Sequence, residues 1–177
     1  IIHCIDYTHT NSSINFATTT GNGEIRCSGS FSHPGGLLTE TGSGSGLITF
    51  DGASSQTITS TGTVTNQVSY RLDNAAGAVL QAGSTFTIND GAFFYRTDGA
   101  LTGAGNVEYL TGGALSYDGS TAITTESSEF PNTNGPDFLV IDNPAGVNLH
   151  DNRSLASGLS LTAGLLNLGP NNLRLET

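Results

Sequence analysis

The stretch YRLDNAAGAVL, at positions 70–80, recurs later in the chain as LVIDNPAGVNL, at positions 139–149, an offset of 69 residues. A second pair of stretches, LITFDGASSQTIT (47–59) and ALSYDGSTAITT (114–125), matches at an offset of 67 residues. Two matches at nearly the same offset indicate an internal repeat. Repeats of this kind are typical of chains built from stacked or arrayed structural units.

The repeating module has about 68 residues and occurs twice, over residues 46–113 and 114–177. Residues 1–45 resemble the end of a further copy, because their pattern of short apolar bursts and glycines is similar. We therefore expect residues 1–177 to form one continuous segment of repeats.

Within the module, apolar and polar residues alternate in short runs such as GLITFDG (46–52) and STFTIND (84–90). Gly, Asn or Asp borders these runs, as is usual at the ends of strands. No segment carries apolar residues at the sustained spacing of an amphipathic helix. The sequence therefore predicts an all-β fold.

Two all-β architectures fit a module of this length. It could hold three coils of a β-solenoid, at about 23 residues per coil, or it could be a β-sandwich repeat. Similar strand–turn units recur about every 20 residues, the turns are short and polar, and the buried Trp common in sandwiches is absent. We predict a β-solenoid, or parallel β-helix, of about seven or eight coils, with β-sandwich repeats as the alternative.

The composition excludes some classes of partner. The net charge is −10, with five Arg and no Lys, so the chain has no means of neutralising a row of phosphates. No apolar run approaches the roughly 20 residues that span a bilayer. We predict no nucleic-acid binding and no membrane insertion. A chain that starts at Ile1 and contains no Met is expected to be a mature, trimmed or excised piece.

The two cysteines, Cys4 and Cys27, are 23 residues apart, which is about one coil. Equivalent residues of successive coils lie about 4.8 Å apart along the stacking axis, within the Cα–Cα range of disulfides. We expect Cys4 and Cys27 to meet as an axial disulfide or as a stacked pair of thiols. Two separate buried thiols are the alternative.

The second module contains LSYDGSTAITT (115–125), SEFPNTNGP (128–136), LVIDNPAGVNLH (139–150) and SGLSLTAGLLNLGPNNLRL (157–175). These stretches resemble a repeat of very large secreted or surface-anchored, adhesin-like proteins of Bacteroidetes-type bacteria, which use the type IX secretion route. The resemblance is looser over residues 44–112. It implies a right-handed parallel β-helix-like stalk at the cell surface or in the secreted matrix, with structural rather than catalytic motifs.

The acidic residues offer one candidate catalytic pair. Glu126 and Glu129 are close in sequence, and glycoside hydrolysis requires two carboxyl groups about 5–9.5 Å apart. We expect instead that Glu126 is a solvated turn residue and that Glu129 anchors the turn before Phe130 and Pro131. No catalytic residue is predicted.

No metal ligand or cofactor is predicted, apart from incidental Ca²⁺ binding. The Asp-Gly pairs at 51–52, 90–91, 98–99 and 118–119 are expected to form turns, because the Gly- and Asp-rich calcium pattern of β-rolls is absent. The histidines are expected to be exposed or lightly packed: His3, His9, His33 and His150.

Aromatic residues gather in the middle third of the chain and are expected mainly in the core. The run AFFYR (92–96) places three aromatic residues in succession, so at least one must point outward. Aromatic rings on an outer face can stack on sugars. Phe93, Tyr95 and Tyr109 are the candidate contacts to a surface polysaccharide.

The chain closes on NNLRLET (171–177), which offers little polar cap for a terminal coil. We expect Leu173, Arg174 and Leu175 to form an edge on which further coils stack, either in a longer parent chain or in a second subunit. The predicted function is a non-enzymatic structural segment of an extracellular adhesin stalk or filament. A carbohydrate-binding or carbohydrate-cleaving β-helix protein is the alternative.

Overall fold

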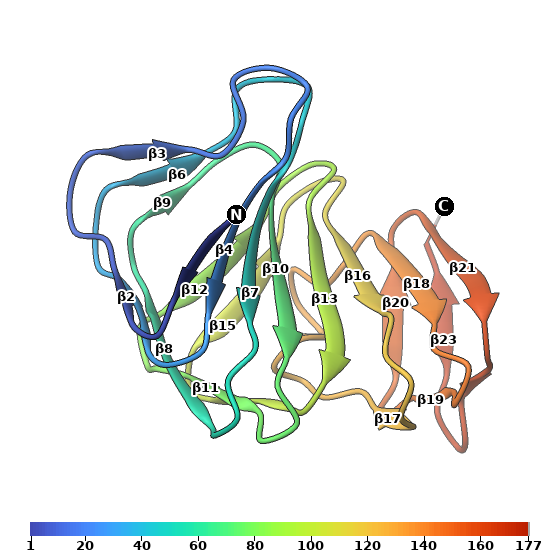
Figure 1. The fold of residues 1–177 in the computed structure, drawn as a ribbon. Helices are drawn as coiled ribbons and strands as arrows, with labels where there is room; N and C mark the ends of the chain where they lie inside the picture. Colours follow the sequence, from blue (N-terminus) through green and yellow to red (C-terminus); the bar gives the residue numbers. More distant parts are fainter. Residues whose placement is uncertain (177) are drawn as a thin grey trace.

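The computed structural model describes residues 1–176 and shows a β-solenoid of eight coils, with no helix in that part of the chain (Figure 1). All strand pairs are parallel, and each strand pairs with strands of the neighbouring coils. This confirms the predicted solenoid, because the hairpins and Greek keys of sandwich repeats would pair strands antiparallel.

Each coil contributes one strand to a single continuous sheet of eight. In order along the solenoid these first-position strands are β1 (Ile2–Cys4), β4 (Gly23–Cys27), β7 (Gly46–Phe50), β10 (Val68–Asp73), β13 (Phe93–Asp98), β16 (Ala114–Tyr117), β18 (Phe138–Asp142) and β21 (Gly158–Ala163).

The other strands form shorter sheets. The second-position strands are β2 (Tyr7–Thr8), β5 (Phe31–His33), β8 (Gln56–Ser60), β11 (Ala78–Leu80) and β14 (Leu101–Gly103), then β17 (Ile123–Thr124), β19 (Val147–Asn148) and β22 (Leu166–Asn167). The third-position strands are β3 (Ser13–Asn15), β6 (Leu37–Thr39) and β9 (Thr63–Val64), then β12 (Thr85–Ile88) and β15 (Asn106–Tyr109), then β20 (Arg153–Leu155) and β23 (Leu173–Leu175).

The register of the long sheet defines the coil length. One row of paired residues runs through all eight coils at intervals of 20 to 24 residues: Ile2, Ile25, Ile48, Tyr70, Phe94, Leu115, Leu139 and Leu159. Three steps of this row lead from Ile48 to Leu115, so the 67-residue offset of the sequence repeat corresponds to three coils. Every interior member of the row is buried.

The repeated Asp-Asn-x-Ala-Gly motif forms the same corner in both copies. Asn74 donates from Nδ2 to Ser54 O and accepts the Ala76 amide on Oδ1, at 2.9 Å in both cases. Asn143 makes the equivalent bonds to Thr121 O (2.7 Å) and from the Ala145 amide (3.0 Å). Both asparagine side chains are buried, so the motif recurs because these hydrogen bonds satisfy the buried side-chain amide while fixing the backbone of the corner.

The core changes in character along the axis. Aromatic rings stack through the first five coils; Tyr7 lies 5.0 Å from Phe31, and Tyr70 lies 4.1 Å from Phe86, between ring centroids. Aliphatic side chains such as Leu139 and Leu155 fill the last coils. Burial of each large side chain contributes roughly 1.5–3 kcal/mol, and each stacked pair of rings roughly 0.5–1.5 kcal/mol more.

The sixth coil breaks the regular pattern. After β17 it has no third-position strand; residues 125–137 cross this face as a loop before β18 begins. The amide of Tyr109, on β15, bonds the carbonyl oxygen of Asn134 in this loop at 3.0 Å. The loop therefore replaces a strand on the third face of the solenoid.

Candidate functional site

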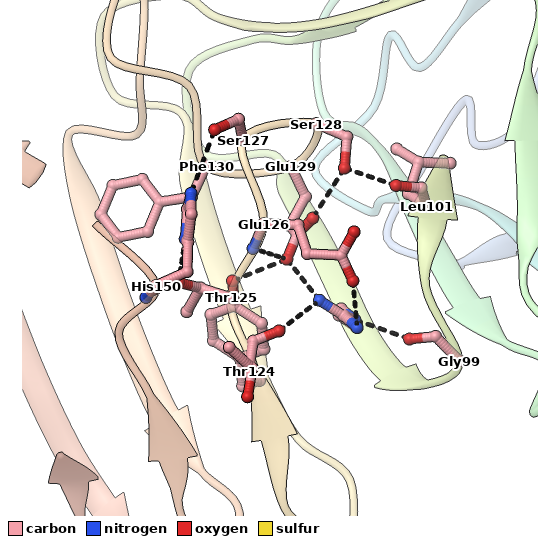
Figure 2. Close-up of polar contacts among 12 residues, drawn as sticks. Gly99, Leu101, Thr124, Thr125, Glu126, Ser127, Ser128, Glu129, Phe130 and His150 are labelled. Carbon is pink, nitrogen blue, oxygen red and sulfur yellow. Dashed lines mark hydrogen bonds and ion pairs between the residues drawn. The ribbon is translucent and has the colours of Figure 1, made fainter. Parts of the chain in front are cut away.

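The loop of the sixth coil carries Glu126 and Glu129, the two carboxylates considered as a catalytic pair. Figure 2 shows Glu129 turned inward among Glu126, Ser128 and Leu101. The side chain of Glu129 is completely buried, whereas that of Glu126 is 39% exposed.

Glu129 is held by several donors. Its Oε1 accepts hydrogen bonds from Arg96 Nη1 at 2.5 Å, from the Glu126 amide at 2.9 Å and from the Tyr117 hydroxyl at 3.1 Å. Its Oε2 accepts the Ser128 hydroxyl at 3.0 Å, and its carbonyl oxygen accepts the Tyr109 hydroxyl at 2.6 Å. Burial raises the pKa of Glu129, and the adjacent Arg96 opposes that rise.

Arg96 is the other half of this buried network. Its Nε donates to Gly99 O at 2.7 Å, its Nη1 also donates to Thr124 O at 3.0 Å, and its Nη2 reaches Glu126 Oε1 at 3.3 Å. The Arg96–Glu129 pair thus ties the fifth coil to the loop of the sixth. Because Glu129 has no solvent access and its oxygens are occupied, this carboxylate holds the loop and is not placed to exchange protons with a bound polymer.

A second polar cluster lies on the outer side of the same loop. His150 Nε2 accepts from Arg153 Nη2 at 2.5 Å, so the Nδ1 proton faces Thr125 Oγ1 at 2.6 Å. Ser127 Oγ lies 3.0 Å from His150 Nε2 and also accepts from Arg153 Nη2 at 2.8 Å. Burial and the Arg153 charge lower the pKa of His150. Since Arg153 occupies the Nε2 lone pair, His150 cannot take a proton from Ser127 in this arrangement.

Arg153 anchors the loop from the seventh coil. Its side chain is buried, with Nε donating to Phe130 O at 2.6 Å and Nη1 donating to Asn132 Oδ1 at 2.7 Å. Two arginines, one from each neighbouring coil, therefore replace the missing strand pairing. Glu129 was singled out from the sequence, but Arg96 and Arg153 were not. The one feature of the sequence that could have drawn attention to these two residues is that arginine is rare in the chain.

The structure separates the three candidate glycan-contact aromatics. Phe93 and Tyr95 point outward from β13 and stack at 5.1 Å between ring centroids, and the Arg71 guanidinium lies 4.7 Å from the Tyr95 ring centroid. Tyr109, in contrast, is only 5% exposed and bonds Glu129 inside the solenoid. Its assignment to a surface is wrong, because Tyr109 lies on the inward side of β15.

The two cysteines lie opposite each other in register on β1 and β4, as free thiols. Cys27 is buried and Cys4 is half-buried. Burial, together with the neighbouring Cys4, raises the pKa of the Cys27 thiol to about 11. The Cys27 thiol therefore stays protonated at neutral pH and is a poor nucleophile.

Two histidines depart from the expectation of light packing. His9 and His33 are buried and stack at 5.3 Å between ring centroids, and no ring nitrogen of either has a hydrogen-bond partner among residues 1–176. Their spacing in sequence, close to that of Cys4 and Cys27, was the signal that sequence reasoning passed over. His3 is exposed, and His150 is half-buried in the cluster above.

Within residues 1–176, no three His, Cys, Asp or Glu side chains converge as a metal site. In two of the four Asp-Gly pairs, the aspartate forms a salt bridge with an arginine. Asp51 pairs with Arg26 at 2.9 Å, and Asp118 pairs with Arg71 at 2.8 Å. Asp51 therefore links neighbouring coils on the outer face, whereas the Asp118–Arg71 pair spans from the sixth coil to the fourth.

The last coil presents open strand edges. β23, which contains Leu173, Arg174 and Leu175, pairs with β20 on one side only, and β21 and β22 are likewise the final strands of their sheets. Leu175 is 52% exposed and Leu161 is 55% exposed, although their in-register partners Leu155 and Ile141 are buried.

Comparisons with protein-family models, with curated proteins and with solved structures returned no match. No helix among residues 1–176 is long and apolar enough to cross a bilayer.

Proposed function

We propose that this chain is a non-enzymatic structural segment of an extracellular stalk or filament, which lengthens by stacking coil on coil. The observation that supports it is the pair of open ends. Strand edges are unpaired at β1, β2 and β3 at one end and at β21, β22 and β23 at the other. Both ends expose large aliphatic side chains, including Ile2 and Leu161.

The two ends match each other in chemistry. The row that begins at Ile2 ends at Leu159, so a second copy stacked head to tail would place an aliphatic side chain on an aliphatic side chain. Each open parallel strand would also gain a partner for its unpaired backbone groups. A contact of this head-to-tail kind does not close on itself, and it generates a filament.

The resemblance to adhesin-like surface proteins supports placing the rod outside the cell. The buried Arg96–Glu129 and Arg153 contacts support a mechanical role, because they tie neighbouring coils together. With about 4.8 Å per coil, eight coils give a rod roughly 38 Å long.

The experiment measures assembly of the purified chain by analytical ultracentrifugation and small-angle scattering over a concentration series. We expect head-to-tail oligomers whose length grows in steps of one rod. Leu161→Glu should abolish assembly, because it places a charge on the exposed end of the core. Thr162→Glu is the matched control, since Thr162 is an exposed neighbour on the same strand and lies at the register shift between β18 and β21, where no residue pairs with it.

Retained circular dichroism would show that Leu161→Glu still folds. A wild-type chain that stays strictly monomeric at all concentrations, or assembly that Leu161→Glu leaves intact, would contradict the proposal.

A further inference from the structure

The corner connections of the solenoid change in length along the axis and leave a hollow on its surface. This hollow is separate from the open ends and from the outward aromatic pair Phe93 and Tyr95. The connections that lead from the third-position strand to the next coil span residues 16–22 and 40–45 in the first two coils. In the next three coils they shrink to residues 65–67, 89–92 and 110–113. Figure 1 shows the two long connections rising together above the rest of the molecule.

The two long connections support each other through backbone hydrogen bonds. The Thr41 amide bonds Ala17 O, and the Ser43 amide bonds Thr19 O, at 3.0 Å in both cases. They form one wall beside the shorter connections. The hollow beside this wall, which we name the step groove, has a volume of about 850 Å³ and spans the second to fifth coils.

Glu40, at the base of the wall, points to a ligand. It lines the step groove, its side chain and backbone together are only 4% exposed, and its Oε1 is buried with no hydrogen-bond partner among residues 1–176. Buried carboxylate oxygens are normally satisfied by a donor, because an unpaired one loses its hydration without compensation. Because Glu40 lines the groove, a turn of its carboxylate toward the groove would let a bound donor satisfy this oxygen.

The floor of the step groove repeats polar side chains along the axis. Asn66 and Gln67 come from the third coil, Asn89 and Asp90 from the fourth, and Thr111 from the fifth. Successive coils place them about 4.8 Å apart. Asn66 Nδ2 already donates to Thr39 Oγ1 at 3.1 Å and to Glu40 O at 2.5 Å, so Asn66 offers the groove only its Oδ1 as an acceptor. The Gln67 amide and the Thr111 hydroxyl both donate and accept, so this floor suits a ligand that carries hydroxyl groups at regular intervals.

The charges that line the step groove, and the hydrogen bonds that its backbone already makes, disfavour some classes of ligand. The cavity contains Glu40 and Asp90 but no Lys or Arg, which disfavours an anionic ligand. A peptide added as a strand would need free backbone groups, whereas the carbonyl oxygens of Gln67 and Gly112 already accept bonds from Gly46 and Gly91. Glu40 and Asp90 belong to no group of three or more His, Cys, Asp or Glu side chains within residues 1–176 that could hold a metal ion.

We propose that the step groove binds a neutral, unbranched polysaccharide lying along the solenoid axis, with the carboxylates of Glu40 and Asp90 accepting hydrogen bonds from its hydroxyl groups. This site lies apart from the outward aromatic pair on β13. It does not depend on end-to-end assembly, because none of its residues belongs to the first or last coil.

The test is affinity electrophoresis and calorimetry of the whole chain against dextran, mannan, xylan and mixed-linkage glucan, with alginate, polylysine and CaCl₂ as further probes. We expect at least one neutral polysaccharide to bind with little dependence on salt. Glu40→Gln and Asp90→Asn should each weaken that binding about tenfold, the effect of losing one charge-assisted hydrogen bond. Tyr95→Ala, on the other face, should leave it unchanged.

Glu40→Gln keeps the size of the side chain, and its thermal unfolding midpoint establishes that it folds. Three results would overturn the proposal: no binding to any neutral polysaccharide, binding confined to polylysine and lost at high salt, or a Glu40-dependent response to CaCl₂ alone. Binding that survives both carboxylate substitutions would overturn it as well. Repeating the measurement in Leu161→Glu separates this site from assembly, since we expect the same affinity there.

Discussion

At the scale of single residues, the most consequential side chains are the charged ones inside the solenoid. Arg96 and Glu129 are both buried and form an ion pair with each other. Each also makes a hydrogen bond to the backbone: Arg96 donates to Gly99 O, and Glu129 accepts from the Glu126 amide. Removing one member of a buried pair leaves the other charge unpaired in a poorly hydrated place, which costs more free energy than the pair itself contributes.

Glu129→Gln should therefore lower the free energy of unfolding by about 3–5 kcal/mol. Glu126→Gln, which removes the exposed partner of the same arginine, should cost only about 0–1 kcal/mol. Urea unfolding followed by circular dichroism measures both. Equal effects of the two substitutions would show that the buried network does not hold the loop.

The stacked histidines make stability depend on pH. Burial and the neighbouring His9 lower the pKa of His33, whereas an imidazole in the unfolded chain takes up its proton near pH 6.5. The unfolded state therefore binds more protons in the window below about pH 6.5, and the stability contributed by neutral His33 is lost as the pH falls through that window.

His33→Leu should weaken the decrease in urea midpoint between pH 8 and pH 5. His3→Leu, at an exposed position, should retain the wild-type dependence. An unchanged pH profile in His33→Leu would refute this assignment.

At the scale of elements, the corners between strands decide whether coils can stack. Gly99, which follows β13, has φ +69°, and a Cβ there would lie 1.9 Å from Asn74 O of the preceding coil. Gly83, before β12, has φ +80°, but a Cβ there would meet nothing within 4 Å. The two glycines share a left-handed backbone and differ in the space around them.

Gly83→Ala should cost about 1–2 kcal/mol, the strain of a left-handed residue with a side chain. Gly99→Ala should cost more than about 3 kcal/mol, because the two coils must also move apart. Denaturant midpoints measure the difference. Similar losses at both positions would indicate that backbone conformation alone selects glycine at these corners.

At the scale of the whole molecule, each coil contacts mainly its neighbours, so stability is close to a sum of coil and interface contributions. The end coils have one neighbour and the central coils have two. Local opening should therefore start at the ends.

Amide hydrogen exchange should be slowest in β10, β13 and β16 and fastest in β1 and β21. At concentrations that produce filaments, exchange at β1 and β21 should slow markedly while the centre stays unchanged. Exchange that is uniform along the chain would instead indicate a single cooperative unit.

The repeat predicted the solenoid because its main contacts join residues about one coil apart. The alternation of Leu47, Ile48, Thr49 and Phe50, for example, was enough to predict a strand. It did not show which of Phe93, Phe94 and Tyr95 point outward, and Tyr109 was assigned to the wrong side.

The amino-acid sequence by itself determined the all-β class and the coil period, and it predicted the alignment of Cys4 with Cys27 that the structure confirms, because each of these depends on spacing that repeats along the chain. The stacking of His9 on His33 depends on the same one-coil spacing, although it was not predicted from the sequence. Only the tertiary structure decided the burial of Arg96 with Glu129 and the existence of the step groove. The physical reason is that these features arise where one coil departs from the next, in a missing strand or a longer connection. Which side chains interact at such places depends on which residues the pairing of the strands brings side by side in the folded chain.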